Sequence, residues 1–353
     1  MAEQRRVAVV TGGTAGVGRA TVCEFARRGY DVAILARGEA GLAGARAEAE
    51  ALGARALPIK VDVADDAAVQ AAASQVEEEL GEIDVWVNVA FAGALAFFWD
   101  TSLDEFRRMT EVTYFGQVHG TGAALARMRP RNRGVIINVG SAMAYRSIPL
   151  QSAYCGAKHA VKGFTESVMC ELAHEKSKVK LCMVQLPGLN TPQFNWNLNK
   201  MSKHPMPVPP VFQPEVAAKG IVFVAEHPRR NMWVGVSTAY TVLGERLAPK
   251  LLDAYLGRTG VKSQQTSKDA PRLGSNVFEP KDQDEDQGAH GPFDDKAHAH
   301  DPQLWMSTHR RSVLAVGAVG AAAATSAMAA TALTAISASR VRSRSRCRRQ
   351  LPH

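Results

Sequence analysis

The chain has 353 residues, 46% of them hydrophobic, which is enough to bury one large core. Its formal net charge of +8 is concentrated at the C-terminal end: residues 312–353 hold six arginines and no acidic residue, so the first 311 residues carry only +2. Because the excess positive charge belongs to the tail and not to a domain surface, the composition argues against a nucleic-acid-binding protein.

The cysteines and the N-terminus indicate a cytoplasmic protein. The five cysteines show no C-x-x-C motif and no paired spacing, so we expect reduced thiols. The N-terminus leads from Arg6 directly into a strand-like segment, without the apolar core of a secretory signal peptide. We expect no metal site, since the histidines at 290, 298 and 300 stand in a polar segment without the regular spacing of metal ligands.

A glycine-rich turn lies between the first predicted strand, residues 6–11, and a predicted helix that ends at Gly29. The turn reads G-G-T-A-G-V-G from Gly12 to Gly18. Glycines let the main chain come close to a pyrophosphate, and the amino end of the following helix attracts its charge. The spacing is G-x-x-x-G-x-G and not the usual G-x-G-x-x-G, but its place at the first strand–helix junction indicates a dinucleotide-binding site.

An arginine follows the second predicted strand, where NAD-binding proteins often carry an acidic residue. The strand runs from Asp31 to Ala36, and Arg37 comes next. An acid near the end of this strand holds the ribose 2′-hydroxyl of NAD, whereas an arginine accommodates the 2′-phosphate of NADP. We therefore predict NADP (NADPH) as the preferred cofactor, with NAD as the alternative. The competing interpretation of Arg37 is an ordinary solvated residue at the start of the next helix.

Strands and helices alternate along the first half of the chain. Strands over 54–61 and 83–88 lead to Asp62 and Asn88, with a helix over 65–80 between them. This alternation predicts an α/β fold, a three-layer, Rossmann-type, doubly wound parallel sheet. Ligands bind at the carboxyl ends of the strands in such sheets, so both polar residues are candidate cofactor contacts. Either one could instead cap the next helix.

The second half continues the alternation. A long helical pattern covers 103–128, and a strand over 133–139 is followed by Ser141 at the ligand-binding edge of the sheet. A helix from 152 to about 176 and a strand over 179–186 come next. The predicted order is again strand, helix, strand, as a single doubly wound domain requires.

A long proline-rich segment over 192–214 is predicted to cover the substrate as a lid, because loops of this length in compact domains are usually functional. A helix opens at Pro214, and Trp233–Tyr240 is predicted to form the last strand. Apolar lid residues suggest a lipophilic substrate, although each of them could equally serve packing: Phe194, Trp196, Met201, Met206 and Phe212.

A tyrosine and a lysine four residues apart supply the candidate chemistry. Tyr154 and Lys158 lie on one face of the predicted helix, so a phenol and an ammonium group share one pocket. A tyrosine titrates near pH ~10, and a shift to pH ~7 requires roughly 4 kcal/mol. An ammonium group about 4 Å away supplies an energy of that order at an effective dielectric constant of about 20. The pair alone occurs by chance on many helices, so the motifs upstream decide its meaning.

With these pieces placed, the chain resembles the short-chain dehydrogenase/reductase family, in its single-domain branch and not in the extended epimerase branch. The extended branch would have glycine where this chain has Ala15. The resemblance runs from about Arg6 to about Leu256. The matching motifs are T-G-G-T-A-G-V-G at Thr11–Gly18, Asp62-Val63, Ser141, Tyr154-x-x-x-Lys158 and Pro187-Gly188-x-x-Thr191.

The resemblance implies a role for each matching residue. Tyr154 is the expected catalytic acid/base, Lys158 lowers its pKa and binds the nicotinamide ribose, and Ser141 orients and polarises the substrate. Asp62 is expected to contact the adenine. The full set of expected cofactor-binding residues is Gly12, Thr14, Gly16, Val17, Gly18, Arg37, Asp62, Val63, Asn88, Ala90, Tyr154, Lys158, Pro187, Gly188 and Thr191.

Two departures from the family pattern affect the site. The family usually shows N-N-A-G after the fourth strand, where this chain reads Asn88-Val89-Ala90-Phe91, so Phe91 is expected to add bulk near the cofactor. The family often places an asparagine in the next helix to complete a proton relay, and Thr113 stands at that position. A hydroxyl can hold a water with a different reach, so Thr113 is the fourth candidate catalytic residue.

The sequence divides into four segments. Residues 1–258 form the predicted catalytic domain, and 259–311 form a polar linker or arm with little core. The segment 312–339 is apolar and rich in alanine, and 340–353 is an arginine-rich tail. The uncharged part of the apolar segment, residues 313–338, is long enough to span a bilayer but only weakly apolar.

The arginines after the apolar segment would be expected on the cytoplasmic side, where the catalytic domain belongs, so a simple span conflicts with the charge distribution. We expect instead a helix lying on the cytoplasmic face of a membrane, contacting it through 312–349. The competing interpretation is a disordered tail that contacts nothing.

The predicted function is NADP-dependent oxidation or reduction of a carbonyl or secondary alcohol on a lipophilic small molecule. The resemblance also implies a homo-oligomer. An alternative is a catalytically weak NADP(H)-binding redox sensor or scaffold at a membrane, suggested by Phe91 and Thr113. A nucleic-acid binder driven by the basic tail is a third hypothesis, which a steep salt dependence of binding would mark.

Overall fold

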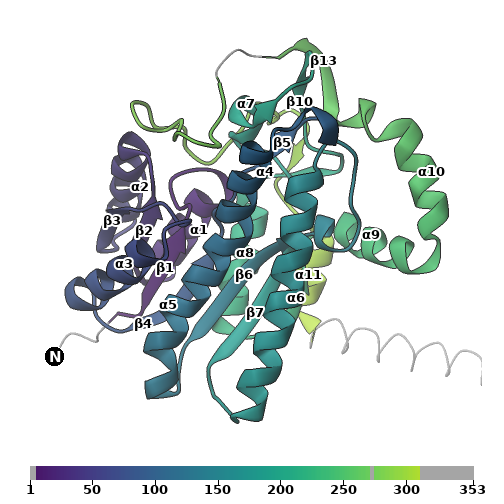
Figure 1. Ribbon diagram of the computed structural model, residues 1–353. Helices are drawn as coiled ribbons and strands as arrows, with labels where there is room; N and C mark the ends of the chain where they lie inside the picture. Colours follow the sequence, from purple (N-terminus) through teal and green to yellow (C-terminus); the bar gives the residue numbers. More distant parts are fainter. Residues whose placement is uncertain (1–4, 271–273, 311–353) are drawn as a thin grey trace, which may run out of the picture. The chain divides into compact units, whose positions relative to one another are not determined.

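The computed structural model describes residues 5–270 and 274–310. Its first compact unit ends at Leu304, and a second unit begins at Trp305. The first unit contains a seven-stranded parallel sheet with the strand order β12-β7-β6-β4-β1-β2-β3 (Figure 1). These strands are β1 (Val7–Thr11), β2 (Asp31–Ala36), β3 (Ala56–Lys60), β4 (Ile83–Asn88), β6 (Val135–Ser141), β7 (Lys180–Leu186) and β12 (Asn231–Trp233).

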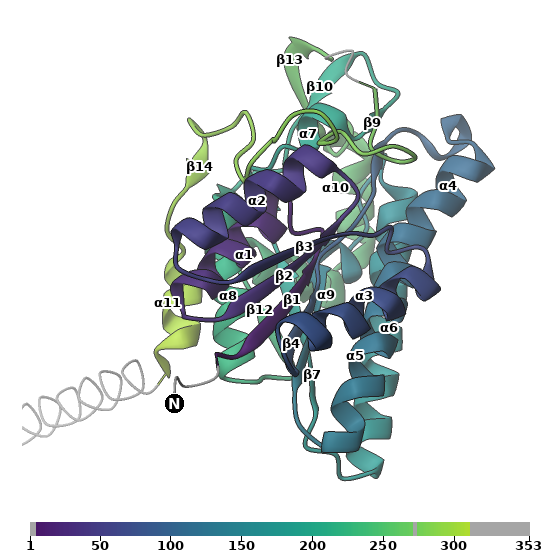
Figure 2. The same cartoon turned by 90° about the vertical axis from the view of Figure 1, so that its left-hand side faces the viewer.

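Helices cover both faces of the sheet, and Figure 2 shows the two helical layers with the sheet between them. Alternate residues of each strand join different cores: Val10 packs against α1, whereas Val9 packs with residues of α3 and α5. One layer holds α1 (Gly16–Arg27), α2 (Glu39–Ala51) and α8 (Pro214–Glu226), and the other holds α3 (Asp66–Glu79), α4 (Leu103–Thr110), α5 (Gly116–Arg131) and α6 (Ser152–His174). Because the apolar strands are buried on both faces, the predicted doubly wound α/β architecture is confirmed.

Two predicted boundaries are wrong. The helix predicted over 103–128 is interrupted by a π-helical turn, η2 (Glu111–Phe115), which separates α4 from α5. The last strand ends at Trp233 and does not reach Tyr240. Gly235 then turns the chain with φ +80°, and α9 (Val236–Leu247) begins, followed by α10 (Pro249–Thr259).

The segments after β7 and α10 are built from short elements. The predicted lid contains α7 (Gln193–Trp196), β9 (Leu198–Asn199), β10 (Lys203–Pro205) and β11 (Val211–Phe212). Strands β13 (Gln265–Asp269) and β14 (Ala297–His298) pair with β10 and β11, respectively. The remaining short elements are β5 (Ala94–Leu95), η1 (Phe98–Asp100), η3 (Ala142–Ala144), β8 (Gly188–Leu189), η4 (Lys262–Gln264) and α11 (Pro302–Thr308).

The polar segment predicted as a linker or arm packs against the catalytic domain. Its apolar side chains Val277, Phe293 and Leu304 are buried, and two of them belong to the cores on the two faces of the sheet. The compact unit therefore continues well past the predicted boundary at 258. The apolar segment and the arginine-rich tail lie outside the described residues, and no helix within 5–270 or 274–310 is long and apolar enough to cross a membrane.

Candidate active site

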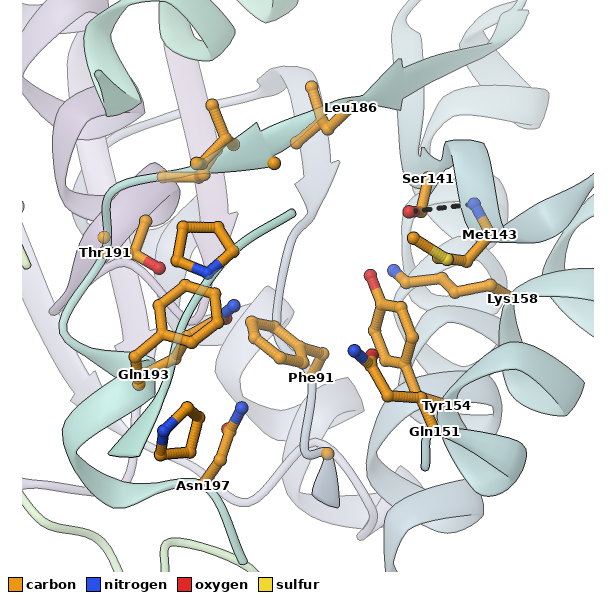
Figure 3. Close-up of a pocket in the computed structure, with 18 of the residues that line it drawn as sticks. Phe91, Ser141, Met143, Gln151, Tyr154, Lys158, Leu186, Thr191, Gln193 and Asn197 are labelled. Atoms are coloured by element: carbon orange, nitrogen blue, oxygen red, sulfur yellow. Dashed lines mark hydrogen bonds between the residues drawn. The ribbon is translucent and has the colours of Figure 1, made fainter. Parts of the chain in front are cut away.

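A cavity of about 630 Å³ opens at the carboxyl ends of the strands. Fourteen residues expected to bind the cofactor line it, together with the candidate catalytic residue Ser141, and Figure 3 shows the part around Tyr154. They are Gly12, Thr14, Gly16, Val17, Gly18, Arg37, Asp62, Val63, Ala90, Tyr154, Lys158, Pro187, Gly188 and Thr191. The fold therefore brings together nearly all the residues that the sequence singled out.

The glycine turn shapes the floor of this cavity. Gly12 has φ +68°, and a Cβ atom there would lie 2.8 Å from the Cα atom of Ala90. A Cβ atom on Gly18 would lie 1.9 Å from the carbonyl oxygen of Gly12. Larger residues would therefore separate β1, α1 and the loop after β4, and the close approach of main chain that a pyrophosphate requires depends on these glycines.

Helix α6 and strand β6 bring the catalytic candidates together. Ser141 is the last residue of β6, whereas Tyr154 and Lys158 lie one turn apart on α6. The Nζ atom of Lys158 lies 5.6 Å from the centre of the Tyr154 ring and donates a hydrogen bond of 2.7 Å to the carbonyl oxygen of Val139. Figure 3 shows the polar ends of Ser141, Tyr154 and Lys158 converging on one point.

Burial has the largest effect on the pKa values of Tyr154 and Lys158. It raises the pKa of Tyr154 to about 12, although a hydrogen bond with Ser141 opposes the rise. It also lowers the pKa of Lys158 to about 7. Desolvation outweighs the hydrogen bond with Ser141, so the net pKa of Tyr154 is raised, and the expected lowering by Lys158 stays a prediction. Tyr154 is therefore a protonated phenol at neutral pH, which is the form that donates a proton.

Phe91 contacts the candidate catalytic tyrosine directly, whereas the sequence indicated only added bulk near the cofactor. Its ring packs edge-on against that of Tyr154 at a centroid distance of 5.7 Å, and it lines the cavity. Figure 3 shows Phe91 between Tyr154 and the segment that carries Thr191. The signal was the departure from the family's N-N-A-G pattern, which placed an aromatic ring at this position.

The outer wall of the cavity comes from α9 and α10, which the sequence did not assign to the site. Its side chains are mostly aromatic or aliphatic. They were missed because the start of α9 was predicted to be a strand. The residues are Ser237, Tyr240, Thr241, Leu252, Tyr255, Leu256 and Thr259. From the predicted lid, Phe194, Trp196 and Met206 line the cavity, whereas Met201 and Phe212 do not.

Thr113 and Asn88 have structural contacts outside the cavity lining. The hydroxyl of Thr113 donates to the carbonyl oxygen of Ala92 at 2.8 Å and accepts from its N–H at 3.0 Å. The side chain of Asn88 is completely buried and donates to Oδ1 of Asn138 at 2.8 Å. Thr113 thus holds the loop after β4, and Asn88 joins β4 to β6. Their predicted roles in catalysis and cofactor binding receive no support from these contacts.

The end of the cavity that is predicted to bind the adenosine is rich in charge. Asp62 pairs with Arg108 of α4 and accepts a hydrogen bond from the main-chain N–H of Ala64, and these contacts lower its pKa although burial opposes them. Arg37 donates to the carbonyl oxygens of Asn276 at 2.6 Å and Phe278 at 2.9 Å. Both predicted adenosine contacts are therefore already engaged by other parts of the chain.

The lining fits a nicotinamide dinucleotide. The hydroxyl oxygen of Thr191 is buried and has no hydrogen-bond partner among the described residues, so it is available to a polar ligand atom. The glycine turn leaves main chain exposed to the cavity close to Thr191, since a Cβ atom on Gly16 would lie 3.1 Å from the Cβ atom of Thr191. Gly12, Gly16 and Gly18 would hold the pyrophosphate, and Lys158 and Thr191 would hold the nicotinamide half.

Comparisons with known proteins agree with this geometry. A family model described as short chain dehydrogenase matches residues 6–202. The uncharacterized oxidoreductase YxnA of Bacillus subtilis (strain 168) is 30% identical over 277 residues, which cover 78% of each chain. The chain therefore belongs to the short-chain dehydrogenase/reductase family, and it is an NAD(P)-dependent oxidoreductase acting on CH–OH or C=O groups.

Three further proteins illustrate the range of the family. The 3-oxoacyl-[acyl-carrier-protein] reductase of Bos taurus is 32% identical over 63% of this chain and 92% of its own. A short-chain dehydrogenase/reductase from Burkholderia phymatum, solved with NAD, shares the fold with a TM-score of 0.61 at 23% identity over 72% of this chain and 97% of that one. A metagenomic oxidoreductase solved with NADP gives a TM-score of 0.55 at 24% identity over 65% and 96%.

Replacing Lys158 by methionine should stabilise the folded protein near neutral pH. The unfolded chain titrates at the ordinary lysine pKa of 10.5, whereas the folded protein titrates at about 7. Between these two pKa values the unfolded state binds a proton that the folded state has lost, so the wild-type free energy of unfolding rises with pH. Below about pH 7 the buried amine is charged in the folded protein, and the full cost of burying that charge lowers its stability. Lys158→Met removes a penalty on the order of 2–4 kcal/mol at low pH, and its advantage narrows toward pH ~10.

Urea unfolding of both proteins from about pH 6 to about pH 9 measures this effect. The control is Lys162→Met, one turn further along α6, where the amine pairs with Glu166 on the surface. A Lys158→Met profile parallel to that of the wild type would show that the buried amine does not set the pH dependence.

Replacing Asn88 by alanine should destabilise the fold and not the cofactor complex. The change leaves the indole N–H of Trp86 without its buried acceptor and removes one of the two donors to the amide oxygen of Asn138, which keeps only the hydroxyl of Thr121. We expect the free energy of unfolding to fall by about 2–4 kcal/mol in a urea titration. If the variant keeps its stability but loses NADPH binding in a fluorescence titration, Asn88 belongs to the cofactor site after all.

Proposed function

We propose that this protein reduces the carbonyl group of a lipophilic small molecule, with NADPH as the hydride donor and Tyr154 as the proton donor. The observation that supports it most is the position of the Tyr154 phenol in the cavity, hydrogen-bonded to Ser141 and buried so that its pKa is raised. A phenol with a pKa of about 12 keeps its proton at neutral pH until a developing alkoxide takes it.

Each residue around Tyr154 would have a separate role in the reaction. Bound NADPH would supply the hydride. Ser141 would donate a hydrogen bond to the substrate oxygen, and Tyr154 would transfer its proton to that oxygen as negative charge develops there. The amine of Lys158, fixed by the carbonyl oxygen of Val139, would hold the ribose and return a proton toward Tyr154. In the reverse direction a phenolate at Tyr154 would take the proton of the alcohol.

The walls of the cavity support a lipophilic substrate. Phe91 lies beside Tyr154, and the facing walls carry Trp196, Tyr240, Leu252 and Leu256. Such a lining excludes water from the reacting oxygen and binds apolar groups by burial. Relatives with acyl substrates, such as the bovine reductase, point the same way. Sterol-like, retinoid-like and acyl carbonyl compounds are therefore the first substrates to test.

The choice of NADP rests on Arg37. Its guanidinium lines the cavity directly after β2, and it could bind a ribose 2′-phosphate once it leaves the carbonyl oxygens of Asn276 and Phe278. NAD remains the alternative, since its ribose hydroxyl needs no positive charge.

Tyr154→Phe tests the function directly, because it removes the proton donor and keeps the volume of the ring. With NADPH and a panel of lipophilic ketones and aldehydes, we expect turnover to fall by at least about 100-fold while NADPH binding is retained. Tyr114→Phe is the matched control, because Tyr114 lies in η2 and outside the cavity lining.

Turnover by Tyr154→Phe at the wild-type rate would reject the mechanism. Tight NADPH binding by the wild-type protein without turnover of any carbonyl would favour the redox sensor over the reductase.

A further inference from the structure

Within the polar segment 259–311, residues 276–288 cross the amino ends of helices α1 and α2, beside the end of the cavity that is predicted to bind the adenosine. From here on, the arm means residues 276–288 alone. The N–H groups of Ala40 and Gly41 donate to the carbonyl oxygens of Gln283 and Asp282 at 3.1 and 2.9 Å. The N–H of Gly16, in the glycine turn, donates to Gly288 at 3.1 Å. Figure 2 shows this part of the chain, in light green, passing above α2. The arm therefore binds main-chain donors of the region that would face a dinucleotide.

A row of glycines on α2 makes room for the carboxylates of the arm. A Cβ atom on Gly38 would lie 2.0 Å from Oδ1 of Asp282, and one on Gly41 would lie 2.3 Å from Oδ2 of the same residue. One turn further along, a Cβ atom on Gly44 would lie 2.1 Å from the carboxylate of Asp286. Three glycines at every third position form one groove, and the arm fills it.

Charged residues of the domain hold the arm in this groove. The two terminal nitrogens of the Arg19 guanidinium, Nη1 and Nη2, donate to the carboxylate of Asp286 at 3.1 and 3.0 Å, although Arg19 is 1% exposed. The Nε of Arg108, which also pairs with Asp62, donates to the carbonyl oxygen of Val277 at 3.1 Å. The docked position is therefore specific, because buried charged groups on two helices depend on it.

The arm changes the surroundings of Arg37 in two ways. Its carbonyl oxygens at Asn276 and Phe278 accept the hydrogen bonds that Arg37 would otherwise offer to a phosphate. Its Asp282, 8% exposed, places a carboxylate against Gly38, directly after Arg37, and lines the cavity. The acid that was missing from the end of β2 in the sequence is thus supplied by a residue about 240 positions later.

We propose that Asp282 and the arm determine cofactor specificity: the docked arm admits the ribose 2′-hydroxyl of NAD(H) and opposes the 2′-phosphate of NADP(H). This inference rests on the proposed function: NADPH is its hydride donor once the arm has left Arg37, and NADH is its hydride donor while the arm is docked. A 2′-phosphate brings negative charge toward the Asp282 carboxylate and needs the guanidinium of Arg37, which the arm holds. A 2′-hydroxyl needs neither, and it can donate a hydrogen bond to the carboxylate.

Binding and docking are then linked in both directions. If the docked arm weakens NADP(H), bound NADP(H) must weaken docking of the arm by the same factor, whereas NAD(H) leaves the arm in place. NADP(H) should therefore expose Lys281, within the arm, to trypsin, and NAD(H) should not.

The first experiment compares Asp282→Asn with Asp284→Asn in the full-length protein. Asp284 is an exposed carboxylate two residues along the arm, so it controls for the loss of one acidic residue. We expect Asp282→Asn to raise the affinity for NADPH relative to that for NADH by about tenfold, measured by fluorescence titration, and Asp284→Asn to leave the ratio unchanged. Equal effects of Asp282→Asn on both cofactors, or no effect on either, would overturn the proposal.

The second experiment releases the arm without touching the cavity. Gly44→Ala directs a methyl group at the Asp286 carboxylate and favours the helical state of α2, so the variant should fold. Gly122→Ala, in α5, where a Cβ atom meets no atom within 4 Å, is the control. We expect Gly44→Ala to raise the NADPH-to-NADH affinity ratio and to speed tryptic cleavage at Lys281, followed by mass spectrometry. Faster cleavage with an unchanged ratio would show that the arm is only a cover.

The two proposals fail in different ways. Cofactor binding with no shift in the ratio in any arm variant rejects the selector and leaves the reductase intact. Normal selection between NADPH and NADH in a protein whose Tyr154→Phe variant turns over carbonyls at the full rate rejects the mechanism and leaves the selector intact. A wild-type chain that binds neither nucleotide rejects both.

Discussion

The hydrogen bond from the Lys158 amine to the Val139 carbonyl joins the two elements on which the active site depends. It attaches α6 to the end of β6, so Tyr154 on the helix and Ser141 on the strand meet at one point. The bond is buried, and a buried amine without a carboxylate partner is costly to charge. The same burial raises the pKa of Tyr154. Stability and chemistry are therefore set by one desolvated pair.

Most of the sheet could be predicted because its strands are apolar along their whole length, as strands buried on both faces must be. The last strand was overestimated because Trp233 and the residues up to Tyr240 have the composition of a strand. The strand ends because Gly235 adopts φ +80° where it packs against the ring of Pro187, and the chain then continues as a helix. The break between α4 and α5 was also missed, since a π-helical turn leaves the apolar pattern of a long helix nearly intact.

The meeting of the candidate catalytic residues could be predicted from the sequence because it depends on local spacing, four residues on a helix or the end of one strand. The residues that surround Arg37 could not, since Asn276, Phe278 and Asp282 reach it through the tertiary fold. One signal was present: Gly38, Gly41 and Gly44 recur at every third position of a segment otherwise rich in alanine. Glycines at helical spacing indicate that another part of the chain approaches closely.

Those glycines have a consequence for the order in which the protein opens. Gly41 and Gly44 lie within α2, and each glycine lowers the intrinsic stability of a helix by about 1 kcal/mol relative to alanine. The thirteen-residue helix therefore depends on what packs into its groove. Helix α2 and the arm, remote in sequence, form one cooperative unit of local unfolding, and their amide hydrogens should exchange together and earlier than those of the central strands. The edge of the domain proposed to meet the adenosine should thus open before the proposed catalytic edge at α6.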